Sequence, residues 1–342
     1  MIDRLAAAPV AAGKLLIEGQ WVDGAGETAV LSPIDGRQLT TLAAAGPNDV
    51  ARACASARAA FEDGRWSRMA PAGRKAALHR LADLIEKHAT ELAVLGVRDN
   101  GTEICMALKA EPGSAAGTFR YYAEAIDKIY GEVAATAHDM TTLVVREPLG
   151  IVAAVVPWNY PMSMAAWKLG PALATGNSVI LKPAEQSPFT ALKFGELAVE
   201  AGIPPGVLNV VLGLGHIAGR ALGLHMDVDC VGFTGSTEVG KYFMQYSGQS
   251  NIKRIGLELG GKSPQVVLAD CEDLDAAAAG IAAGIFANTG QVCNAGSRLI
   301  VDAKIRDVLL EKIAAQAKIF APGDPLSATN RMGSMVSEEQ MD

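Results

Sequence analysis

The chain has 342 residues, of which 50% are hydrophobic and 20% are charged, and its net charge is −7 at pH 7. It can bury a large core and is too long for one ordinary domain, so two or more lobes are expected. The acidic balance and the lack of any Lys/Arg-rich block exclude nucleic acid and anionic membrane surfaces as expected partners. No apolar run is long enough to cross a membrane, and the N-terminus lacks a basic-then-apolar signal pattern.

The cysteines are odd in number and form no C-x-x-C pair, which predicts a reducing, cytoplasmic location. They are Cys54, Cys105, Cys230, Cys271 and Cys293.

Residues 1–46 are expected to be extended. Apolar and polar side chains alternate over residues 15–22, and two dipeptides typical of hairpin turns follow, Asp23-Gly24 and Asp35-Gly36. Helices are expected next, because apolar residues recur at helical spacing after the cap Pro47-Asn48-Asp49.

Three amphipathic helical segments and a strand pair complete the first half of the chain. The helical segments cover residues 50–61, 74–88 and 90–100. Cys54 lies on the apolar side of the first and is expected to pack in the core. After a helix through residues 123–128, β-rich stretches around 131–133 and 141–146 predict a strand pair that projects as an arm and pairs with another subunit.

From Ile151 onwards, short apolar strands alternate with helical patterns, which is typical of a doubly wound α/β domain with a parallel sheet. Strands are expected over residues 151–156, 178–181, 208–212, 230–233 and 252–257, with helices within 162–174, 189–200, 217–224 and 239–245. Cys230 falls in one of these strands, where core packing is its expected role. Ligands of such sheets bind beyond the carboxyl ends of the strands.

Two turns after these strands carry polar residues suited to catalysis and to a nucleotide. In the first, prolines stiffen the chain around Asn159, whose amide can point at an anion; an ordinary turn asparagine is the alternative. In the second, Lys182 and Glu185 can bind the hydroxyls of a ribose, and a surface ion pair is the alternative. A glutamate there repels a 2′-phosphate, which favours NAD over NADP.

Two glycine-containing turns follow. The string from Gly213 to Gly219 has the spacing G-x-G-x-x-x-G, one residue off the dinucleotide fingerprint. It is therefore weak evidence for a dinucleotide-binding turn. Gly235-Ser236 forms a turn before a predicted helix, where free N–H groups favour a phosphate. His216 and His225 have no partners at ligand spacing, so no metal site is expected.

A thiol and a carboxylate complete the chemistry. Cys293 is flanked by small and amide residues, as a reactive thiol would be, and Glu258 stands among apolar residues just before Gly260-Gly261. We expect Glu258 to be buried, with a raised pKa. Together they predict covalent catalysis followed by hydrolysis. Cys271 has no such role.

The chain closely resembles the NAD(P)-dependent aldehyde dehydrogenase superfamily. The strings that carry the resemblance, in order, are Ile17-Glu-Gly-Gln-Trp-Val, Leu81-Ala-Asp-Leu-Ile-Glu, Pro157-Trp-Asn-Tyr-Pro, Leu181-Lys-Pro-Ala-Glu, Phe233-Thr-Gly-Ser, Leu257-Glu-Leu-Gly-Gly-Lys and Gly290-Gln-Val-Cys.

The resemblance implies the roles of individual residues. Cys293 is the nucleophile, Asn159 the oxyanion-hole side chain, Glu258 the general base and Lys168 a group in proton transfer. The substrate tunnel is walled by Tyr160, Met164 and Trp167. The cofactor contacts are Val156, Pro157, Trp158, Lys182, Glu185, Gly215, Gly219, Phe233, Thr234, Gly235, Ser236, Val239 and Leu259.

The resemblance also implies a division of the chain. Residues 1–120 and 146–258 form the NAD-binding domain with an N-terminal helical part, residues 121–145 form an oligomerisation arm, and residues 259–342 begin the catalytic domain. The chain stops before the Glu-x-Phe-Gly-Pro motif of this family, so a C-terminally truncated catalytic domain is expected. The full-length protein is expected to be a homodimer or homotetramer.

The expected reaction is the oxidation of an aldehyde to a carboxylic acid with NAD, through a cysteine thiohemiacetal and a thioester that a Glu258-activated water hydrolyses. Two alternatives stay open: a thiol esterase that uses Cys293 and Glu258 without a cofactor, and a non-catalytic remnant. Phe119-Arg-Tyr-Tyr-Ala and Asp127-Lys-Ile-Tyr-Gly-Glu-Val most resemble the branch that oxidises amino-aldehydes, including betaine aldehyde and γ-glutamyl-γ-aminobutyraldehyde.

Overall fold

The computed structural model describes residues 1–342, and its centre is a seven-stranded sheet in the order β11-β10-β7-β8-β9-β1-β2. Five strands run parallel, while β1 and β2 add an antiparallel edge. This confirms the predicted doubly wound α/β fold. The strands are β1 (Leu15–Ile17), β2 (Gln20–Val22), β7 (Ile151–Val155), β8 (Ser178–Lys182), β9 (Leu208–Val210), β10 (Cys230–Gly235) and β11 (Arg254–Leu259).

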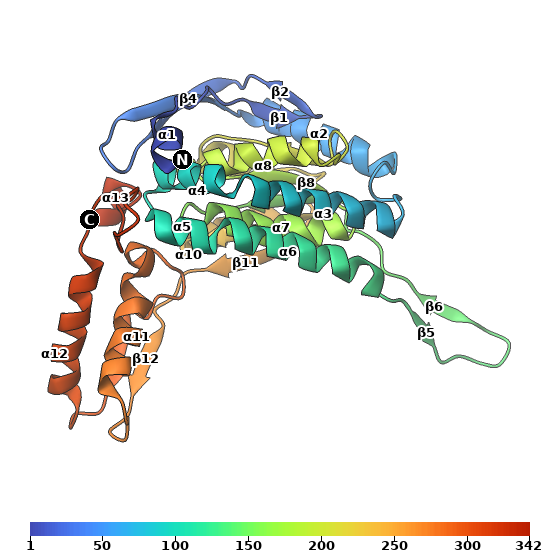
Figure 1. Cartoon of the computed structure of the whole chain (residues 1–342). Helices are drawn as coiled ribbons and strands as arrows, with labels where there is room; N and C mark the ends of the chain where they lie inside the picture. Colours follow the sequence, from blue (N-terminus) through green and yellow to red (C-terminus); the bar gives the residue numbers. More distant parts are fainter.

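The main core forms where helices cover this sheet. Strands β7 and β8 are buried along their whole length, as expected of strands covered on both faces. Helix α2 packs on β7, β8 and β9, whereas α3 and α6 form an outer layer over α7 (Figure 1). The helices around the sheet are α2 (Pro47–Glu62), α3 (Pro71–Lys87), α4 (Ala89–Asn100), α6 (Pro112–Ala125), α7 (Pro161–Ala174), α8 (Phe189–Glu200), α9 (Arg220–Leu224) and α10 (Thr237–Gly248).

The N-terminal segment is only partly extended. It begins with a helix, α1 (Ile2–Ala7), which corrects the prediction for residues 1–46. The turn between β1 and β2 is Glu18-Gly19, both at positive φ, and β3 (Gly26–Leu31) pairs with β4 (Gln38–Ala44) as a second hairpin. Helix α5 (Ile104–Ala110) was not predicted.

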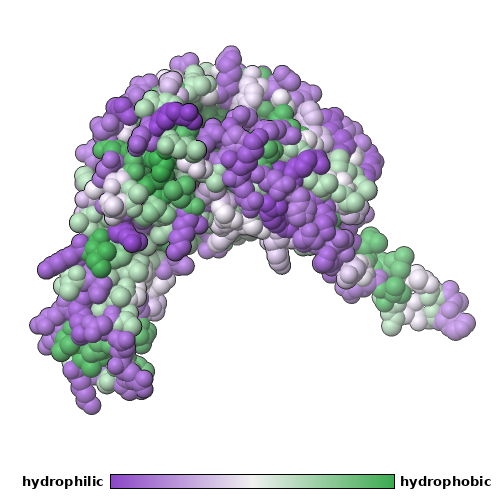
Figure 2. Space-filling model, in the orientation of Figure 1, coloured by the Kyte–Doolittle hydropathy of each residue, from purple (hydrophilic) through white to green (hydrophobic).

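Two projections leave the body on opposite sides in Figure 1. One is the predicted strand pair, β5 (Glu132–Ala134) with β6 (Thr142–Val144), whose residues are all exposed. The other is a small parallel sheet of β12 (Pro264–Val267) and β13 (Arg298–Val301), packed with α11 (Leu274–Phe286) and α12 (Arg306–Ala317). Figure 2 shows apolar side chains on both projections.

Shorter turns of helix join these elements. They are η1 (Ile126–Lys128), η2 (Gly215–Gly219), η3 (Ala287–Gly290), η4 (Lys318–Phe320) and α13 (Glu338–Met341). The predicted helix over 217–224 therefore begins with a π-helical turn, η2. Strand β11 starts two residues after Ile252, whose positive φ of 57° is incompatible with an extended strand. None of the helices combines the length and the apolar character that a bilayer crossing requires.

Candidate active site

The parallel strands bring several predicted site residues to one edge of the sheet. Val155 pairs with Lys182 across β7 and β8, and Gly235 pairs with Leu259 across β10 and β11. The turns that follow these four strands therefore leave the same edge. We call it the carboxyl edge, and the opposite end of the parallel strands the amino edge.

The thiol lies in a tightly turned loop after α11. Asn288 and Thr289 both adopt left-handed backbone conformations, with φ of 49° and 59°, and Gly290 follows at 74°. The Gln291 N–H donates to the Asn288 carbonyl at 3.0 Å, which closes the turn. Cys293 emerges from it half-buried. We call residues 287–293 the thiol loop.

Asn159 contacts the thiol loop directly. Its Nδ2 donates to the Gln291 carbonyl at 2.8 Å, two residues before the thiol, and its own carbonyl accepts from Asn288 Nδ2 at 3.2 Å. A primary amide has two N–H groups, so one anchors Asn159 and the second is left for a ligand. The structure thus joins the predicted amide donor to the loop that carries the predicted nucleophile.

Tyr160 lies in the same neighbourhood. Burial, followed by the negative charges of Glu111, Glu103 and Cys293, raises the pKa of Tyr160 to about 12. The other two predicted tunnel residues both lie on α7, but in surroundings that differ from each other. Met164 is buried in the main core with 8% of its surface exposed, whereas Trp167 is 53% exposed and borders a surface hollow of about 480 Å³.

Lys168 and Glu258 are both neighbours of Thr234, near the ends of β10 and β11. Lys168 Nζ donates to Thr234 Oγ1, and Thr234 pairs with Glu258 in the sheet. Burial lowers the pKa of Lys168 to about 8, against the opposing effect of the Glu258 charge. The lysine stem runs over Gly232, where a Cβ would lie 3.6 Å from Lys168 Cδ.

The expected burial of Glu258 is wrong: its side chain is exposed. Strand β11 is the outermost strand of the sheet, and its residues alternate between exposed and half-buried positions. The Gly260-Gly261 pair nevertheless allows a close approach to the thiol loop. A Cβ built on Gly261 would lie 3.5 Å from the Cys293 carbonyl oxygen.

Lys182 is a buried group, not part of a surface ion pair. Its side chain is 3% exposed, and its Nζ donates to the Pro183 carbonyl at 2.9 Å and reaches Glu185 Oε2 at 3.4 Å. Burial lowers the pKa of Lys182, and Glu185 opposes that shift. Two polar partners leave one of the three ammonium hydrogens free for a ligand.

A cavity of about 750 Å³ adjoins Glu185 and Gln186. Its other walls are the β3–β4 hairpin and residues 333–338, which the sequence analysis did not single out because they form no recognisable motif. Thr289 and Ser337 line this cavity, and their hydroxyl oxygens are buried without a hydrogen-bond partner. Unpaired buried hydroxyls of this kind suit a ligand rich in hydroxyl or phosphate groups.

The glycines around the start of α10 pack closely against side chains, whereas those of η2 do not. Ser236 caps α10, with its Oγ accepting from the Val239 N–H at 3.2 Å, and Gly235 lies against the ring of Phe233. Helix α10 can lie close to β11 because residue 240 is a glycine. A Cβ built on Gly240 would lie 2.8 Å from a side-chain atom of Leu259. Gly215 and Gly219 open and close η2, and a Cβ at Gly215 would meet no atom.

Glu111 was missed by the sequence analysis. Its Oε2 accepts from the N–H groups of Met162 and Ser163 in the first turn of α7, at 2.9 and 3.2 Å, while its Oε1 has no partner. Burial raises the pKa of Glu111 to about 7. Nothing local in the sequence marks it, because its contacts lie about fifty residues away.

Comparisons with known proteins bear on the family and the fold of the chain. A profile of the aldehyde dehydrogenase family matches residues 21–342. The NADP/NAD-dependent aldehyde dehydrogenase PuuC of Escherichia coli K12 is 50% identical over 325 residues, which cover 94% of this chain and 66% of PuuC. The chain thus spans just under two thirds of that relative's length.

Two solved structures superimpose on the chain with TM-scores of 0.97. One is an indole-3-acetaldehyde dehydrogenase in complex with NAD+, 49% identical, and the other is the γ-glutamyl-γ-aminobutyraldehyde dehydrogenase of Burkholderia cenocepacia J2315, 50% identical. Each match covers 99% of this chain and 69% of the solved chain.

Proposed function

The chain belongs to the aldehyde dehydrogenase family, and from that premise we propose that it oxidises an aldehyde to a carboxylic acid with NAD, using Cys293 as the nucleophile. The observation that carries this proposal is the 2.8 Å hydrogen bond from Asn159 Nδ2 to the Gln291 carbonyl. It supports a site in which an amide donor and a thiol face the same carbonyl group. Residues 259–342 would then be the first part of a catalytic domain, and the β5–β6 arm would pair with a second subunit.

The first step is addition of the Cys293 thiolate to the aldehyde carbon. A carbon–sulfur bond forms, and the π electrons of the carbonyl move to its oxygen. The second N–H of Asn159 and the backbone N–H of Cys293 would hold this oxyanion. Losing one such donor typically lowers the rate about 10²–10³-fold. The bound NAD would supply the acceptor for the hydride that leaves this carbon.

Hydrolysis of the resulting thioester releases the acid and regenerates the thiol. Glu258 would take a proton from the attacking water, and its exposed position gives it access to solvent. Lys168, held on Thr234 beside Glu258, would pass that proton on, since its pKa of about 8 is close to the operating pH.

The cofactor would lie along the carboxyl edge. Lys182 and Glu185 would contact the adenosine ribose, and the turn at Gly235-Ser236 would hold the pyrophosphate at the N-terminus of α10. Glu185 would repel a 2′-phosphate, so NAD is the preferred cofactor. The remaining contacts would come from the strand ends and glycine turns named above: Val156, Pro157, Trp158, Gly215, Gly219, Phe233, Thr234, Val239 and Leu259.

The substrate would be an amino-aldehyde, entering past Tyr160, Met164 and Trp167. The strings Phe119-Arg-Tyr-Tyr-Ala and Asp127-Lys-Ile-Tyr-Gly-Glu-Val support this class. The Burkholderia relative, named for γ-glutamyl-γ-aminobutyraldehyde, supports it as well. The indole-3-acetaldehyde enzyme, at nearly the same identity, makes an aromatic aldehyde the necessary comparison substrate.

The test is NADH formation by the purified protein with NAD and a panel of amino-, aliphatic and aromatic aldehydes. Cys293→Ala should abolish it, whereas Cys271→Ala, which removes a thiol outside the site, should not. Absence of NADH with every aldehyde, or unchanged turnover in Cys293→Ala, would contradict the proposal. Ester cleavage without NAD and without aldehyde oxidation would favour a thiol esterase. Failure of NAD to raise the melting temperature would favour a non-catalytic remnant.

A further inference from the structure

The thiol loop and Asn159 are joined by a closed ring of hydrogen bonds. Asn159 Nδ2 donates to the Gln291 carbonyl at 2.8 Å, the Gln291 N–H donates to the Asn288 carbonyl at 3.0 Å, and Asn288 Nδ2 donates back to the Asn159 carbonyl at 3.2 Å. We call these three residues the amide ring. It holds Asn159 from two sides, by its side chain and by its backbone.

The connection between α4 and α5 supports this ring from outside. Thr102 Oγ1 donates to Asn288 Oδ1 at 2.7 Å, and both residues are almost fully buried. The bond fixes which end of the Asn288 amide faces Asn159, because only the Nδ2 end can donate. Burial raises the pKa of the neighbouring Glu103 carboxyl, and backbone N–H groups, that of Asn288 among them, oppose this rise.

The side-chain hydrogen bonds of Asn288 are not explained by its left-handed backbone conformation alone. A left-handed turn favours asparagine over most residues, and a side chain chosen only for that purpose can face solvent. Asn288 is instead 1% exposed, and both ends of its amide contact segments 129 and 186 residues away in sequence.

We propose that Asn288 is a positioning residue that fixes the separation between the Asn159 amide and the Cys293 thiol, and that Thr102 orients it. This inference rests on the proposed function, in which those two groups act on one carbonyl. Without the Asn288 amide, Asn159 loses one of its two attachments to the thiol loop, the one made through its backbone carbonyl. A displacement near 1 Å at a reacting centre can lower the rate about 10²-fold.

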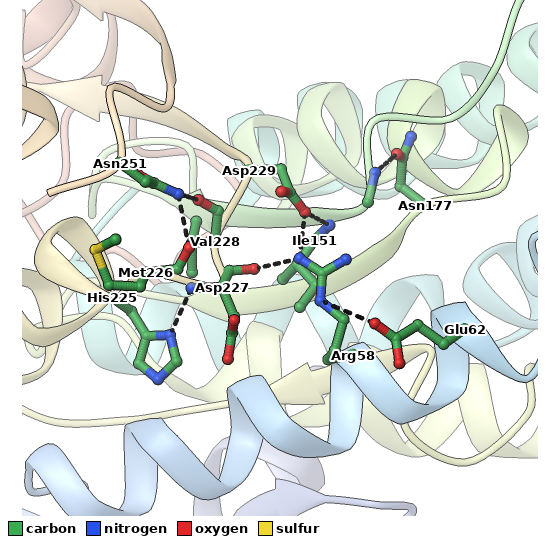
Figure 3. A network of polar contacts seen from close by, with 11 residues as sticks. Arg58, Glu62, Ile151, Asn177, His225, Met226, Asp227, Val228, Asp229 and Asn251 are labelled. Atoms are coloured by element: carbon green, nitrogen blue, oxygen red, sulfur yellow. Dashed lines mark hydrogen bonds and ion pairs between the residues drawn. The ribbon is translucent and has the colours of Figure 1, made fainter.

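Three variants separate positioning from turn formation. Asn288→Gly keeps the left-handed turn and removes the amide; Asn288→Asp keeps an acceptor for Thr102 and removes the donor to Asn159; Thr102→Val removes the orienting hydroxyl at nearly constant shape. The matched control is Asn177→Asp. Asn177 is also a buried asparagine bonded at both ends, but it lies at the amino edge, in the network of Figure 3.

We expect Asn288→Gly to lower kcat about 10–100-fold with the KM for NAD within about twofold, and Asn288→Asp and Thr102→Val to lower kcat by less. Asn177→Asp should lower the melting temperature and leave kcat unchanged. Hydrogen exchange should show that the segments 157–161 and 288–293 lose protection together in Asn288→Gly. Wild-type kcat and unchanged protection in Asn288→Gly would overturn the inference.

The exchange measurement does not depend on turnover. If the wild-type protein forms no NADH, the proposed function fails, and hydrogen exchange still decides the role of Asn288. Joint loss of protection in both segments supports the inference, whereas loss confined to residues 288–291 shows a local turn only and overturns it.

Discussion

The amino and carboxyl edges of the sheet use the same residue types in opposite ways. At the amino edge, Asp229 Oδ2 accepts from the Ile151 N–H and from Arg58 Nη2, both at 2.7 Å (Figure 3). Asn177 Oδ1 accepts from the Gly150 N–H at 2.9 Å, and Asn251 Nδ2 donates to two backbone carbonyls. The side chains of Asp229, Asn177 and Asn251 thus form hydrogen bonds with backbone N–H and C=O groups that other elements leave unpaired.

At the carboxyl edge, some polar side chains keep hydrogen-bonding groups that no protein group uses. The Lys182 ammonium has one close carbonyl partner and a carboxylate at 3.4 Å, and Thr289 Oγ1 has no partner although it is buried. Buried polar groups without partners are rare in folded proteins and lower stability unless a ligand satisfies them. Residue type alone therefore does not separate a structural polar group from one that can bind a ligand; the position and surroundings of each group must be compared as well.

Two lysines, one at each edge, give the sharpest test of this comparison. Lys168 lies at the carboxyl edge, and Lys253 lies near the amino edge, where its Nζ donates to the Gly223 carbonyl at 2.7 Å and to Ser250 Oγ at 2.6 Å. Lys168→Met should lower kcat roughly 10²–10⁴-fold, the usual effect of losing a proton-transfer group. Lys253→Met should lower the melting temperature and leave kcat unchanged. Equal kinetic effects of the two substitutions would erase the distinction between the edges.

The lowered pKa of Lys168 also predicts a pH dependence. The neutral form of Lys168 increases as the pH rises through about 8, so wild-type kcat should rise up to that pH, and Lys168→Met should lose this limb. The lowered pKa also destabilises the fold. Between the folded pKa and the higher pKa of an unfolded lysine, the unfolded chain binds more protons, so the stability penalty is full below about pH 8 and is relieved as the pH rises. Lys168→Met should therefore be more stable than wild type at pH 7, with the difference shrinking towards pH 10 in urea titrations.

The amino edge should respond to substitution in stability alone. Asp229→Ala leaves the Ile151 N–H without its acceptor and removes one partner of Arg58, which still donates to the Asp227 carbonyl at 2.7 Å. The free energy of unfolding should fall by about 1–3 kcal/mol, the range for an unsatisfied buried donor, with kcat unchanged. Urea denaturation monitored by circular dichroism measures the first, and initial rates at saturating NAD measure the second. A reduced kcat at unchanged stability would contradict the assignment.

Cofactor choice tests a single charge at the carboxyl edge. Glu185→Gln should raise the ratio of kcat/KM for NADP to that for NAD by roughly tenfold, because one repulsive charge near the surface contributes about 1–4 kcal/mol. The control is Glu196→Gln, which removes an exposed glutamate of α8 that pairs with Lys193. A ratio that stays constant in Glu185→Gln would place the 2′-position away from Glu185.

The smallest effect concerns the cap of α10. Ser236→Ala should lower the free energy of unfolding by about 1 kcal/mol and weaken NAD binding. Ser236→Asp should restore the cap and its stability, yet bind NAD less tightly because its charge repels a pyrophosphate. Calorimetric titration with NAD separates the two. Normal NAD affinity in Ser236→Asp would remove this turn from the cofactor site.

The parallel strands, the projecting hairpin and the carboxyl-edge turns were predictable because their signals are local. Apolar β-branched runs mark Ile151–Val155 and Ser178–Lys182, and Gly-Ser marks the start of α10. The amide ring was not predictable, since Asn288 and Asn159 are 129 residues apart and nothing in the sequence pairs their side chains and backbones. Glu258 was misjudged because apolar neighbours in sequence do not show whether the face of the sheet that carries a side chain is covered, and successive residues of β11 alternate between its two faces.

The exposed arm has a practical consequence for handling the protein. A two-stranded ribbon with no packed face is only marginally stable in water, so residues 135–141 at its tip should be the first peptide bonds that a protease cleaves. Helix α6 before the arm packs against α7 after it. A chain nicked there would migrate as two bands under denaturing conditions while still eluting as one folded particle.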